Sequence, residues 1–162
     1  MKVSKGSITA VDHNETYLEE LALKVSEQTI DNIKCEKADM RNLHYADNSI
    51  DIIWAEGAIY IIGFKKGLKE WKRILKPNGI IAVTELSWIA DGIPKEISEF
   101  WSLEYSEMQS VEENINTANV CGYHVESHLT LPESAWYEAY NEPLKIRINE
   151  LKVKYEDNEE AQ

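Results

Sequence analysis

The apolar residues of this chain alternate between short strand-like runs and longer stretches with helical spacing. Residues 7–11 form the first run, and from Asn14 the apolar positions recur every three to four residues, which predicts a strand and then a helix. Two further strands are expected at 33–37 and 80–86. Residues 50–55 are apolar almost throughout, so we expect a strand here that is buried on both faces.

A helix is expected between the last two strands. Its apolar positions from Phe64 to Leu75 follow a helical period, and Pro77-Asn78-Gly79 stops it before the strand at 80–86. Strands and helices that alternate in this way form a parallel sheet with helices on both faces. The pattern predicts an α/β, Rossmann-like fold, with residues 1–162 forming a single domain.

The pattern changes beyond Trp88. Helical spacing returns over residues 97–108, with aromatic side chains on the apolar side. Ser110 and Glu113 have the spacing of a capping box, which predicts that a further helix starts at Ser110.

Apolar and polar residues alternate over 123–131. This period of two predicts a strand with one wetter face, which Pro132 ends. The remainder is expected to be helical with a break at Pro143, and the polar residues 156–162 are expected to fray.

Composition limits the class of protein. The chain has 162 residues, of which 43% are hydrophobic, enough for one globular unit with a real core. No stretch reaches the roughly 18 apolar residues of a membrane span, and residues 1–5 lack the apolar core of a signal peptide, so a cytoplasmic protein that does not bind membranes is expected. The two cysteines, Cys35 and Cys121, have the spacing of neither a disulfide framework nor a metal site, and no metal is expected.

The charge distribution argues against nucleic-acid partners. The net charge is -12, and residues 96–144 contain ten Glu and no Lys or Arg. Binding to a phosphate backbone needs a basic surface. The lysines between Lys65 and Lys76 lie mostly on the predicted helix and form its solvated outer face, so DNA and RNA are excluded as expected partners.

Asp12 stands where a Rossmann-type fold places the acid that binds a ribose, at the end of a strand that leads into a helix. The glycine turn of such folds lies roughly 20 residues upstream of that acid. Only eleven residues precede Asp12, and the seven glycines of the chain never form a G-x-G. Part of a nucleotide site is therefore expected without its phosphate-side loop.

Four segments together resemble the class I S-adenosylmethionine-dependent methyltransferases, in particular the small-molecule, type 11-like branch. The four segments are Val11-Asp12, Ala38-Asp39-Met40, the run 49–54, and Glu70 to Gly79 with the strand after it. The last segment is the most specific, because it matches the family's sequence of a helix, Leu, Lys-Pro-x-Gly and an apolar strand. The resemblance covers about residues 7–88. A nicotinamide-dinucleotide enzyme would share only the ribose acid and is disfavoured.

The resemblance implies an S-adenosylmethionine site. In such enzymes the acid after the second strand binds the ribose hydroxyls, which here is Asp12, and His13 would flank the adenine, unless it is an ordinary loop histidine. Asp39 and Met40 match the adenine clamp, in which the carboxylate accepts from the exocyclic amine and the next backbone N–H meets a ring nitrogen.

The resemblance also implies where the acceptor binds. Glu56 matches the position that lines the methionine end of the cofactor and the substrate mouth, with a plain loop glutamate as the alternative. Tyr60 and Trp88 would line a small, partly apolar acceptor pocket, or else be core aromatics. The residues after the third strand lack the Asp/Asn-Pro-Pro-aromatic motif used on nucleobase amines, so a small-molecule acceptor is expected, and no catalytic residue is assigned.

The family sheet has seven strands in the order 3-2-1-4-5-7-6, and the five strands expected here correspond to its strands 2 to 6. The missing first and seventh strands would leave two gaps in an incomplete sheet, with unpaired edges. We therefore expect part of a methyltransferase, with weak or no cofactor binding and little activity by itself, that forms a homodimer. The alternative is a non-catalytic interaction or structural protein derived from this fold, which dimerises through its incomplete sheet.

Overall fold

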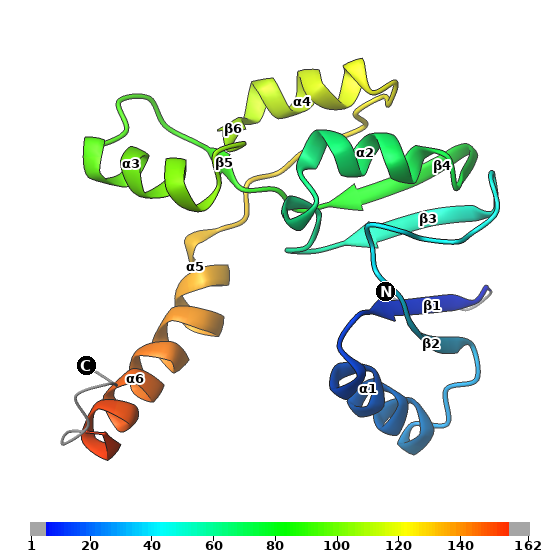
Figure 1. Cartoon of the computed structure of the whole chain (residues 1–162), viewed down its shortest axis with the longest axis horizontal. Coiled ribbons are helices and arrows are strands. Elements are labelled where there is room, and N and C mark those ends of the chain that lie inside the picture. The colour runs from blue at the N-terminus through cyan, green and yellow to red at the C-terminus, as the bar shows by residue number, and fades with distance from the viewer. Residues whose placement is uncertain (1–5, 156–162) are drawn as a thin grey trace. The chain divides into compact units, whose positions relative to one another are not determined.

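A computed structural model describes residues 6–155 of the chain (Figure 1). The chain divides into two compact units, Met1–His124 and Val125–Gln162, which are taken separately below. The prediction of a single domain over residues 1–162 stays a prediction, and the predicted fraying of residues 156–162 lies outside the described residues.

The first unit begins with a strand, a helix and a second strand, as predicted. β1 (Ile8–Asp12) and β2 (Ile33–Lys37) pair in parallel, and α1 (Glu15–Glu27) connects them. Asn14 caps α1, because its side chain accepts a hydrogen bond from the backbone N–H of Thr16. The parallel pairing brings the ends of both strands, and the loops that follow them, to one edge.

The second strand pair departs from the expected boundaries. β3 (Ile50–Ala55) lies where it was predicted, whereas α2 (Phe64–Lys72) ends three residues before Leu75 and β4 spans Leu75–Val83. Ile50 pairs with Leu75 but Ile52 pairs with Ile80, so the Pro77-Asn78-Gly79 turn is an irregularity within β4. The expected strand at 80–86 was therefore placed too late, and the expected helix was too long.

The expectation that residues 50–55 are buried on both faces was wrong. Ile52 and Trp54 are 52% and 60% exposed, and Ile80, the partner of Ile52 on β4, is 57% exposed. Side chains two residues apart on a strand share a face. This face of the β3–β4 pair is open, because within the described residues nothing covers these side chains.

The core of the first unit is centred on α2. Ile59, in the 3-10 helix η1 (Ile59–Ile61), is fully buried, and Leu68 and Ile74 are 2% exposed. A Cβ added to Gly67 would lie only 2.6 Å from Cγ1 of Ile59, so glycine at this position allows α2 to pack closely on η1.

The rest of the first unit contains two helices and a short strand pair. α3 (Lys95–Glu104) is followed by α4 (Val111–Val120), and the two-residue strands β5 (Ser87–Trp88) and β6 (Gln109–Ser110) pair in parallel. The predicted capping box is confirmed: Ser110 Oγ accepts from the backbone N–H of Glu113, and the Glu113 carboxylate accepts from the backbone N–H of Ser110.

The predicted strand at 123–131 was wrong. Residues 123–132 form no strand, and Leu129 is 77% exposed. A period of two is realised as a strand only if a neighbouring strand satisfies the backbone groups, and no described strand pairs with this segment.

The second unit is helical. Three helical segments follow one another directly: α5 (Glu133–Trp136), the π-helical η2 (Tyr137–Asn141) and α6 (Glu142–Lys154). A break was expected at Pro143, and the structure has a π-helical stretch just before that residue. Pro143 has no N–H to donate to the preceding turn, and a wider turn accommodates this loss.

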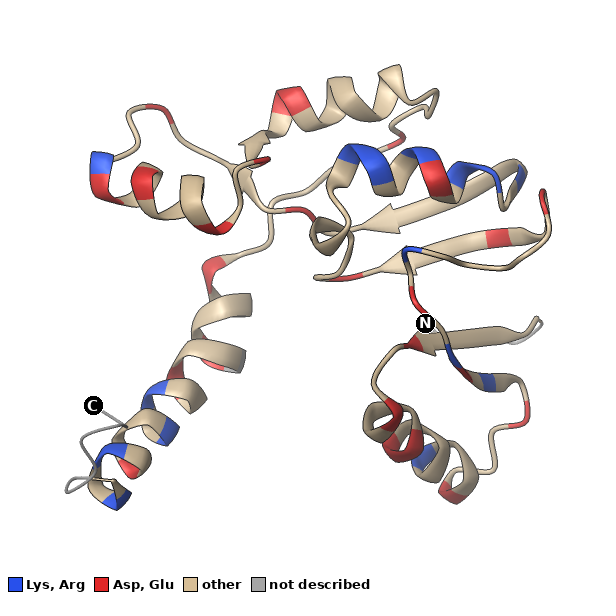
Figure 2. Cartoon of the chain, in the orientation of Figure 1, with Lys and Arg blue, Asp and Glu red and all other residues tan. Residues whose placement is uncertain are grey.

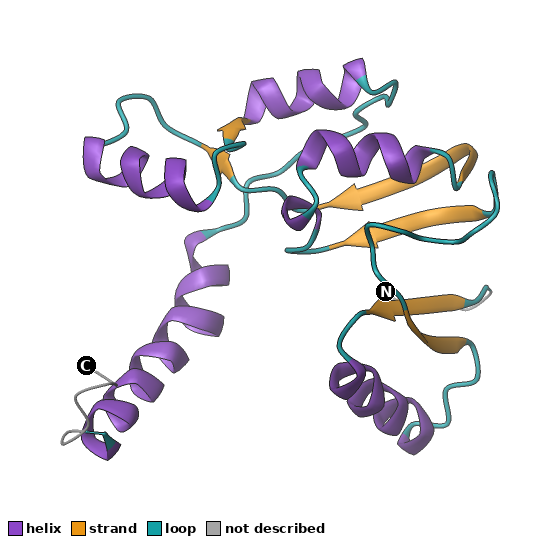
Figure 3. Cartoon of the chain, in the orientation of Figure 1, coloured by secondary structure: helices purple, strands orange, loops and turns teal. Residues whose placement is uncertain are grey.

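Among the described residues the six strands form three separate parallel pairs, β1–β2, β3–β4 and β5–β6 (Figure 3). The α/β, Rossmann-like class is confirmed. The lack of pairing between β1 and β3 coincides with the first expected gap in the sheet. Between residues 6 and 155, no helix has both the length and the apolar character to cross a membrane.

Candidate functional site

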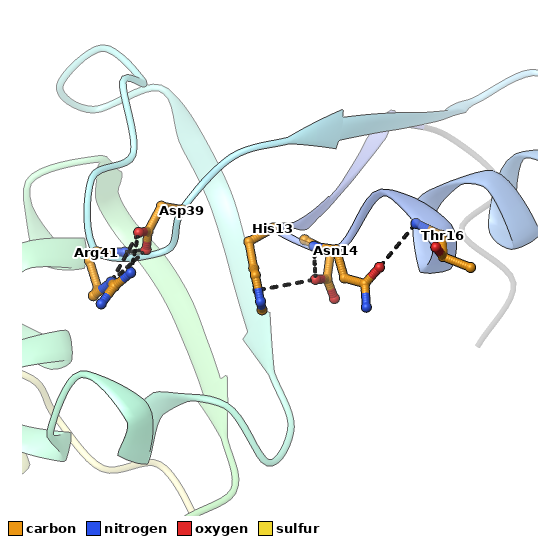
Figure 4. Close-up of polar contacts among 6 residues, drawn as sticks. His13, Asn14, Thr16, Asp39 and Arg41 are labelled. Carbon is orange, nitrogen blue, oxygen red and sulfur yellow. Dashed lines mark hydrogen bonds and ion pairs between the residues drawn. The ribbon is translucent and has the colours of Figure 1, made fainter.

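The carboxyl end of the β1–β2 pair carries the first group of predicted site residues (Figure 4). Asp12 Oδ1 accepts a 2.8 Å hydrogen bond from the backbone N–H of Asn14 and lies 3.4 Å from Nδ1 of His13. The Asp12 side chain is 38% exposed and that of His13 is 82% exposed. No hydrogen bond to Oδ2 of Asp12 is found among the described residues, so this oxygen is available to a ligand hydroxyl.

Asp39 lies at the same edge, because the backbone N–H of Ala38 bonds to the carbonyl of Asp12. Its two oxygens accept hydrogen bonds of 2.7 to 3.0 Å from Nε and Nη2 of Arg41, and Oδ1 also accepts from the Arg41 backbone N–H. The guanidinium of Arg41 lowers the pKa of Asp39 to about 2, with a small contribution from His13. Asp39 therefore lies at the carboxyl end of β1–β2, with Arg41 bound to its carboxylate, and its role as an adenine clamp stays a prediction.

Met40, the other member of the predicted clamp, is held by its backbone. The indole N–H of Trp71, a buried residue of α2, donates a 3.1 Å hydrogen bond to the Met40 carbonyl. A pocket of about 350 Å³ lies beside this contact, lined by the loop 40–43 and by residues of the last turn of α2 and beyond. The loop that follows β2 is therefore tied to α2 at the Met40 position.

Glu56 follows β3, as predicted. Its Oε1 accepts a 2.9 Å hydrogen bond from the indole N–H of Trp54. The next residue, Gly57, donates its backbone N–H to Oγ1 of Thr84, and Thr84 N donates to the carbonyl of Ala55. The loops after β3 and β4 are joined by these contacts at one edge.

Tyr60 is half exposed and packs edge-on against Tyr105, with 6.0 Å between the ring centroids. The Tyr105 hydroxyl donates a 2.6 Å hydrogen bond to Oε1 of Glu85. Burial, partly opposed by this hydrogen bond, raises the pKa of Glu85, and burial also raises the pKa of Tyr105. A predicted acceptor-pocket residue is thus linked through one aromatic ring to a carboxyl group.

Trp88 lies in β5 and is half-buried. Its neighbour Ser87 accepts a 3.0 Å hydrogen bond through Oγ from the amide of Asn114, a buried residue of α4. The strand that carries Trp88 is therefore fixed to α4.

Sequence reasoning missed Arg41, Glu85 and Tyr105. Arg41 follows Asp39 at a spacing of two, which is typical of a local ion pair in a turn. Tyr105 was taken as an apolar position of a helix, and Glu85 as part of a strand; their contact spans 20 residues, and no local pattern predicts it. In the described part of the chain, no group of three or more His, Cys, Asp or Glu could hold a metal ion.

Comparisons of this sequence with a family profile and with known proteins both identify methyltransferases. The family profile described as a methyltransferase domain matches residues 1–83. A demethylmenaquinone methyltransferase of Staphylococcus epidermidis is 34% identical over 85 residues, which are 52% of this chain and 34% of that enzyme. The ubiquinone/menaquinone biosynthesis C-methyltransferase UbiE of Bdellovibrio bacteriovorus is 32% identical over 101 residues, 62% of this chain and 43% of that enzyme. This chain therefore spans less than half the length of these relatives.

Solved structures show the same fold. A Galdieria sulphuraria protein, provisionally assigned as a sarcosine dimethylglycine methyltransferase, matches 92% of this chain and 57% of its own with a TM-score of 0.72 and 23% identity. A SAM-dependent methyltransferase from Aquifex aeolicus matches 81% of this chain and 66% of its own, with a TM-score of 0.58 and 21% identity.

Proposed function

We propose, from the premise that this chain belongs to the class I S-adenosylmethionine-dependent methyltransferases, that it is part of an enzyme that methylates a small molecule. The cofactor of the family is S-adenosylmethionine. The relatives that match are named as quinone C-methyltransferases, which supports a small-molecule acceptor. The observation that carries the proposal is that Asp12 and Asp39 stand together at the carboxyl end of β1–β2, where Rossmann-type folds bind nucleotides.

In this proposal Asp12 binds the ribose. Its Oδ2 accepts from a ribose hydroxyl, while Oδ1 stays bonded to the backbone of Asn14, which keeps the carboxylate oriented. His13, on the same edge, flanks the adenine. The open oxygen of Asp12 is the feature of this structure that fits the cofactor.

The adenine is bound by the loop after β2. Met40 offers its backbone N–H, and the Trp71 bond to its carbonyl fixes the orientation of that residue. Asp39 accepts from the exocyclic amine after Arg41 releases one oxygen. The ion pair is exposed, so solvent screens it, and the amine has to replace only part of its set of hydrogen bonds.

Methyl transfer itself depends on how the acceptor is positioned relative to the cofactor. Bound S-adenosylmethionine supplies a methyl group on a positively charged sulfur, and the protein has to hold the acceptor in line with it and exclude water. Glu56, Tyr60 and Trp88 line the acceptor side, at the edge where the loops after β3 and β4 are joined.

We expect binding of the cofactor by the 162-residue chain to be weak, because its glycines provide no G-x-G turn for close backbone approach to the methionine end. Titration with S-adenosylhomocysteine, followed by amide chemical shifts, should move residues 12–13 and 39–41 first. Asp12→Asn should weaken this binding about tenfold, the effect of one lost charge-assisted hydrogen bond. The matched control is Asp31→Asn, an exposed acid before β2, at the opposite end of this strand pair.

Two results would count against these assignments. Equal affinity of the Asp12→Asn and Asp31→Asn variants would remove Asp12 from the site. Tight, micromolar binding by the unmodified chain would show that the glycine turn is not needed. Titration with a nicotinamide dinucleotide serves as the ligand control.

A second candidate function, a non-catalytic protein that dimerises through its incomplete sheet, is favoured by the open apolar face of β3–β4. Ile52, Trp54 and Ile80 are each more than half exposed on that face, and exposed apolar patches mark interaction surfaces. In this alternative, two copies of the chain form the homodimer by packing this face of β3–β4 against each other. Sedimentation should show a dimer that Trp54→Lys dissociates, whereas Leu23→Lys on the exposed side of α1 should not. A monomer at high concentration would rule out this mode of association.

A further inference from the structure

Glu85 lies beyond β4, at the edge where the proposed acceptor side is found. The chain between β4 and Glu85 is held in place, because Thr84 bonds through its backbone to Ala55 and through its hydroxyl to Gly57. Ala55 is the last residue of β3, and Gly57 directly follows Glu56. The backbone at Glu85 is therefore fixed relative to the loop after β3.

The two oxygens of the Glu85 carboxyl group have different surroundings. Oε1 accepts the 2.6 Å hydrogen bond from the hydroxyl of Tyr105. Oε2 is buried and has no hydrogen-bond partner among the described residues. A buried acceptor without a donor is unfavourable and rare in native proteins, so a donor that reaches this oxygen, from a ligand or from a water molecule, would be stabilised there.

No cation of the described chain pairs with Glu85. None of the ion pairs found between residues 6 and 155 includes it. The charged group that shifts its pKa is Glu107, which is also acidic and raises it. Figure 2 shows that α4 carries acidic but no basic positions, and residues 96–144 contain no Lys or Arg. The unpartnered, buried oxygen is therefore suited to a neutral or cationic donor and unsuited to an anion.

An aromatic surface adjoins the carboxyl group. The Tyr105 ring, which donates to Glu85, packs edge-on against the half-exposed ring of Tyr60. A planar or partly apolar molecule that contacts Tyr60 would lie one ring away from the Glu85 carboxyl group. The arrangement places an aromatic ring beside one hydrogen-bond acceptor, and both are groups that line small-molecule sites.

We propose that Oε2 of Glu85 binds the O–H or N–H group of the methyl acceptor and takes its proton during methyl transfer. This inference rests on the proposed function and adds a catalytic residue and a substrate class to it: acceptors whose nucleophilic form arises by loss of an O–H or N–H proton.

The step balances. The acceptor forms a bond to the methyl carbon with its electron pair, the carbon–sulfur bond of the sulfonium breaks, and the electron pair of that bond stays on sulfur. The acceptor's proton moves to Glu85 and leaves to solvent after product release. Burial raises the pKa of Glu85, which makes it a stronger base than an exposed carboxylate.

The test uses the full 162-residue chain and two probes that differ by one donor: phenol, which has an O–H, and anisole, its methyl ether, which has none. Amide chemical shifts near Tyr60 and Ser87 report binding. Phenol should bind about tenfold more tightly than anisole, the difference expected for a hydrogen bond to a buried acceptor. Glu85→Leu should abolish this preference, and Glu104→Gln, an exposed position at the end of α3, should leave it unchanged.

A second variant, Glu85→Gln, separates hydrogen bonding from proton transfer. Its result can be interpreted even if Glu85→Leu fails to fold. The phenol preference should rise with pH in the unmodified chain as Glu85 ionises, and Glu85→Gln should keep an acceptor but lose this pH dependence. Absence of phenol binding, equal binding of the two probes, or a preference that survives Glu85→Leu overturns the proposal. The same pH profile in Glu85→Gln as in the unmodified chain also overturns it. The titrations with phenol and anisole contain no cofactor, so the two proposals can fail separately. Failure to bind S-adenosylhomocysteine counts against the proposed function, and failure of the phenol and anisole titrations counts against the role of Glu85.

Discussion

The hydroxyl of Tyr105 donates a 2.6 Å hydrogen bond to Oε1 of Glu85 and joins the end of α3 to the segment after β4. Tyr105 is 9% exposed, and Oε2 of Glu85 is buried. The contact therefore orients a carboxyl group that is otherwise without a polar partner among the described residues. Stability and the ionisation of Glu85 should both depend on it.

Tyr105→Phe should destabilise the chain by about 1–3 kcal/mol, because the removal of one partner leaves a buried acceptor unsatisfied. It should also raise the pKa of Glu85 further, since the Tyr105 hydrogen bond lowers it. Urea unfolding measures the first effect and carboxyl carbon NMR the second. Tyr17→Phe, on the exposed side of α1, is the control; a Tyr105 variant as stable as this control would contradict the prediction.

Glu85→Gln should change the pH dependence of stability. The pKa of Glu85 is raised by burial above its ordinary value of 4.5, so the folded state binds the proton more tightly than the unfolded state. The associated stability is present below 4.5 and is lost as the pH rises through the folded-state pKa. Relative to the unmodified chain, the Gln variant should therefore gain stability as the pH rises from 4.5 through the folded-state pKa of Glu85. Parallel unfolding curves for the two proteins at every pH would refute this.

Trp71→Phe should loosen the loop at Met40 while it keeps a buried aromatic ring. The variant loses the 3.1 Å hydrogen bond from the indole N–H to the Met40 carbonyl, at a cost of about 1 kcal/mol. Hydrogen exchange at Asn42, whose N–H bonds to the Asp39 carbonyl, should become faster. Exchange at Thr117, in the middle of α4, is the internal reference and should change only if the whole unit is destabilised.

Arg41→Gln should release Asp39. Because the guanidinium is the main cause of the lowered pKa, the pKa of Asp39 should return from about 2 toward 3.8. The stability that comes from this lowered pKa is present above 3.8 and is lost as the pH falls toward about 2 in the unmodified chain. If Asp39 is the adenine clamp, S-adenosylhomocysteine should bind the variant about two- to fivefold more tightly, since no exposed ion pair has to be broken. Weaker binding would mean that Arg41 contributes to the site itself.

Ser110→Ala should remove the cap of α4 at a cost of about 1 kcal/mol. The same change should raise the lowered pKa of Glu113, because the hydroxyl of Ser110 is one of its donors. Thermal unfolding and carboxyl NMR measure the two effects. Ser102→Ala, on the exposed side of α3, provides a control for loss of a serine hydroxyl outside a cap.

Local patterns predicted a large part of the fold. The strands at 33–37 and 50–55 lie where they were expected, and so do the helix caps at Asn14 and Ser110. These features depend on side chains and backbone groups only a few residues apart. The positions of Asp12 and Asp39 at one edge followed as well, since parallel strands bring their carboxyl ends together.

The wrong predictions all concern features that depend on a distant partner. The alternation of residues 123–131 predicted a strand, but a strand requires a neighbour, and none of the described strands pairs with it. The apolar run 50–55 predicted burial on both faces, yet a residue such as Trp54 is buried only if another element covers it.

The sequence by itself determined the order of the strands and longer helices as far as β4, the methyltransferase resemblance and the edge at which Asp12 and Asp39 lie. Only the tertiary structure decided that the β3–β4 face is open and that Tyr105 meets Glu85. The physical reason is that burial and hydrogen bonding between residues 20 or more positions apart are set by how elements pack, which the periodicity of each element does not specify.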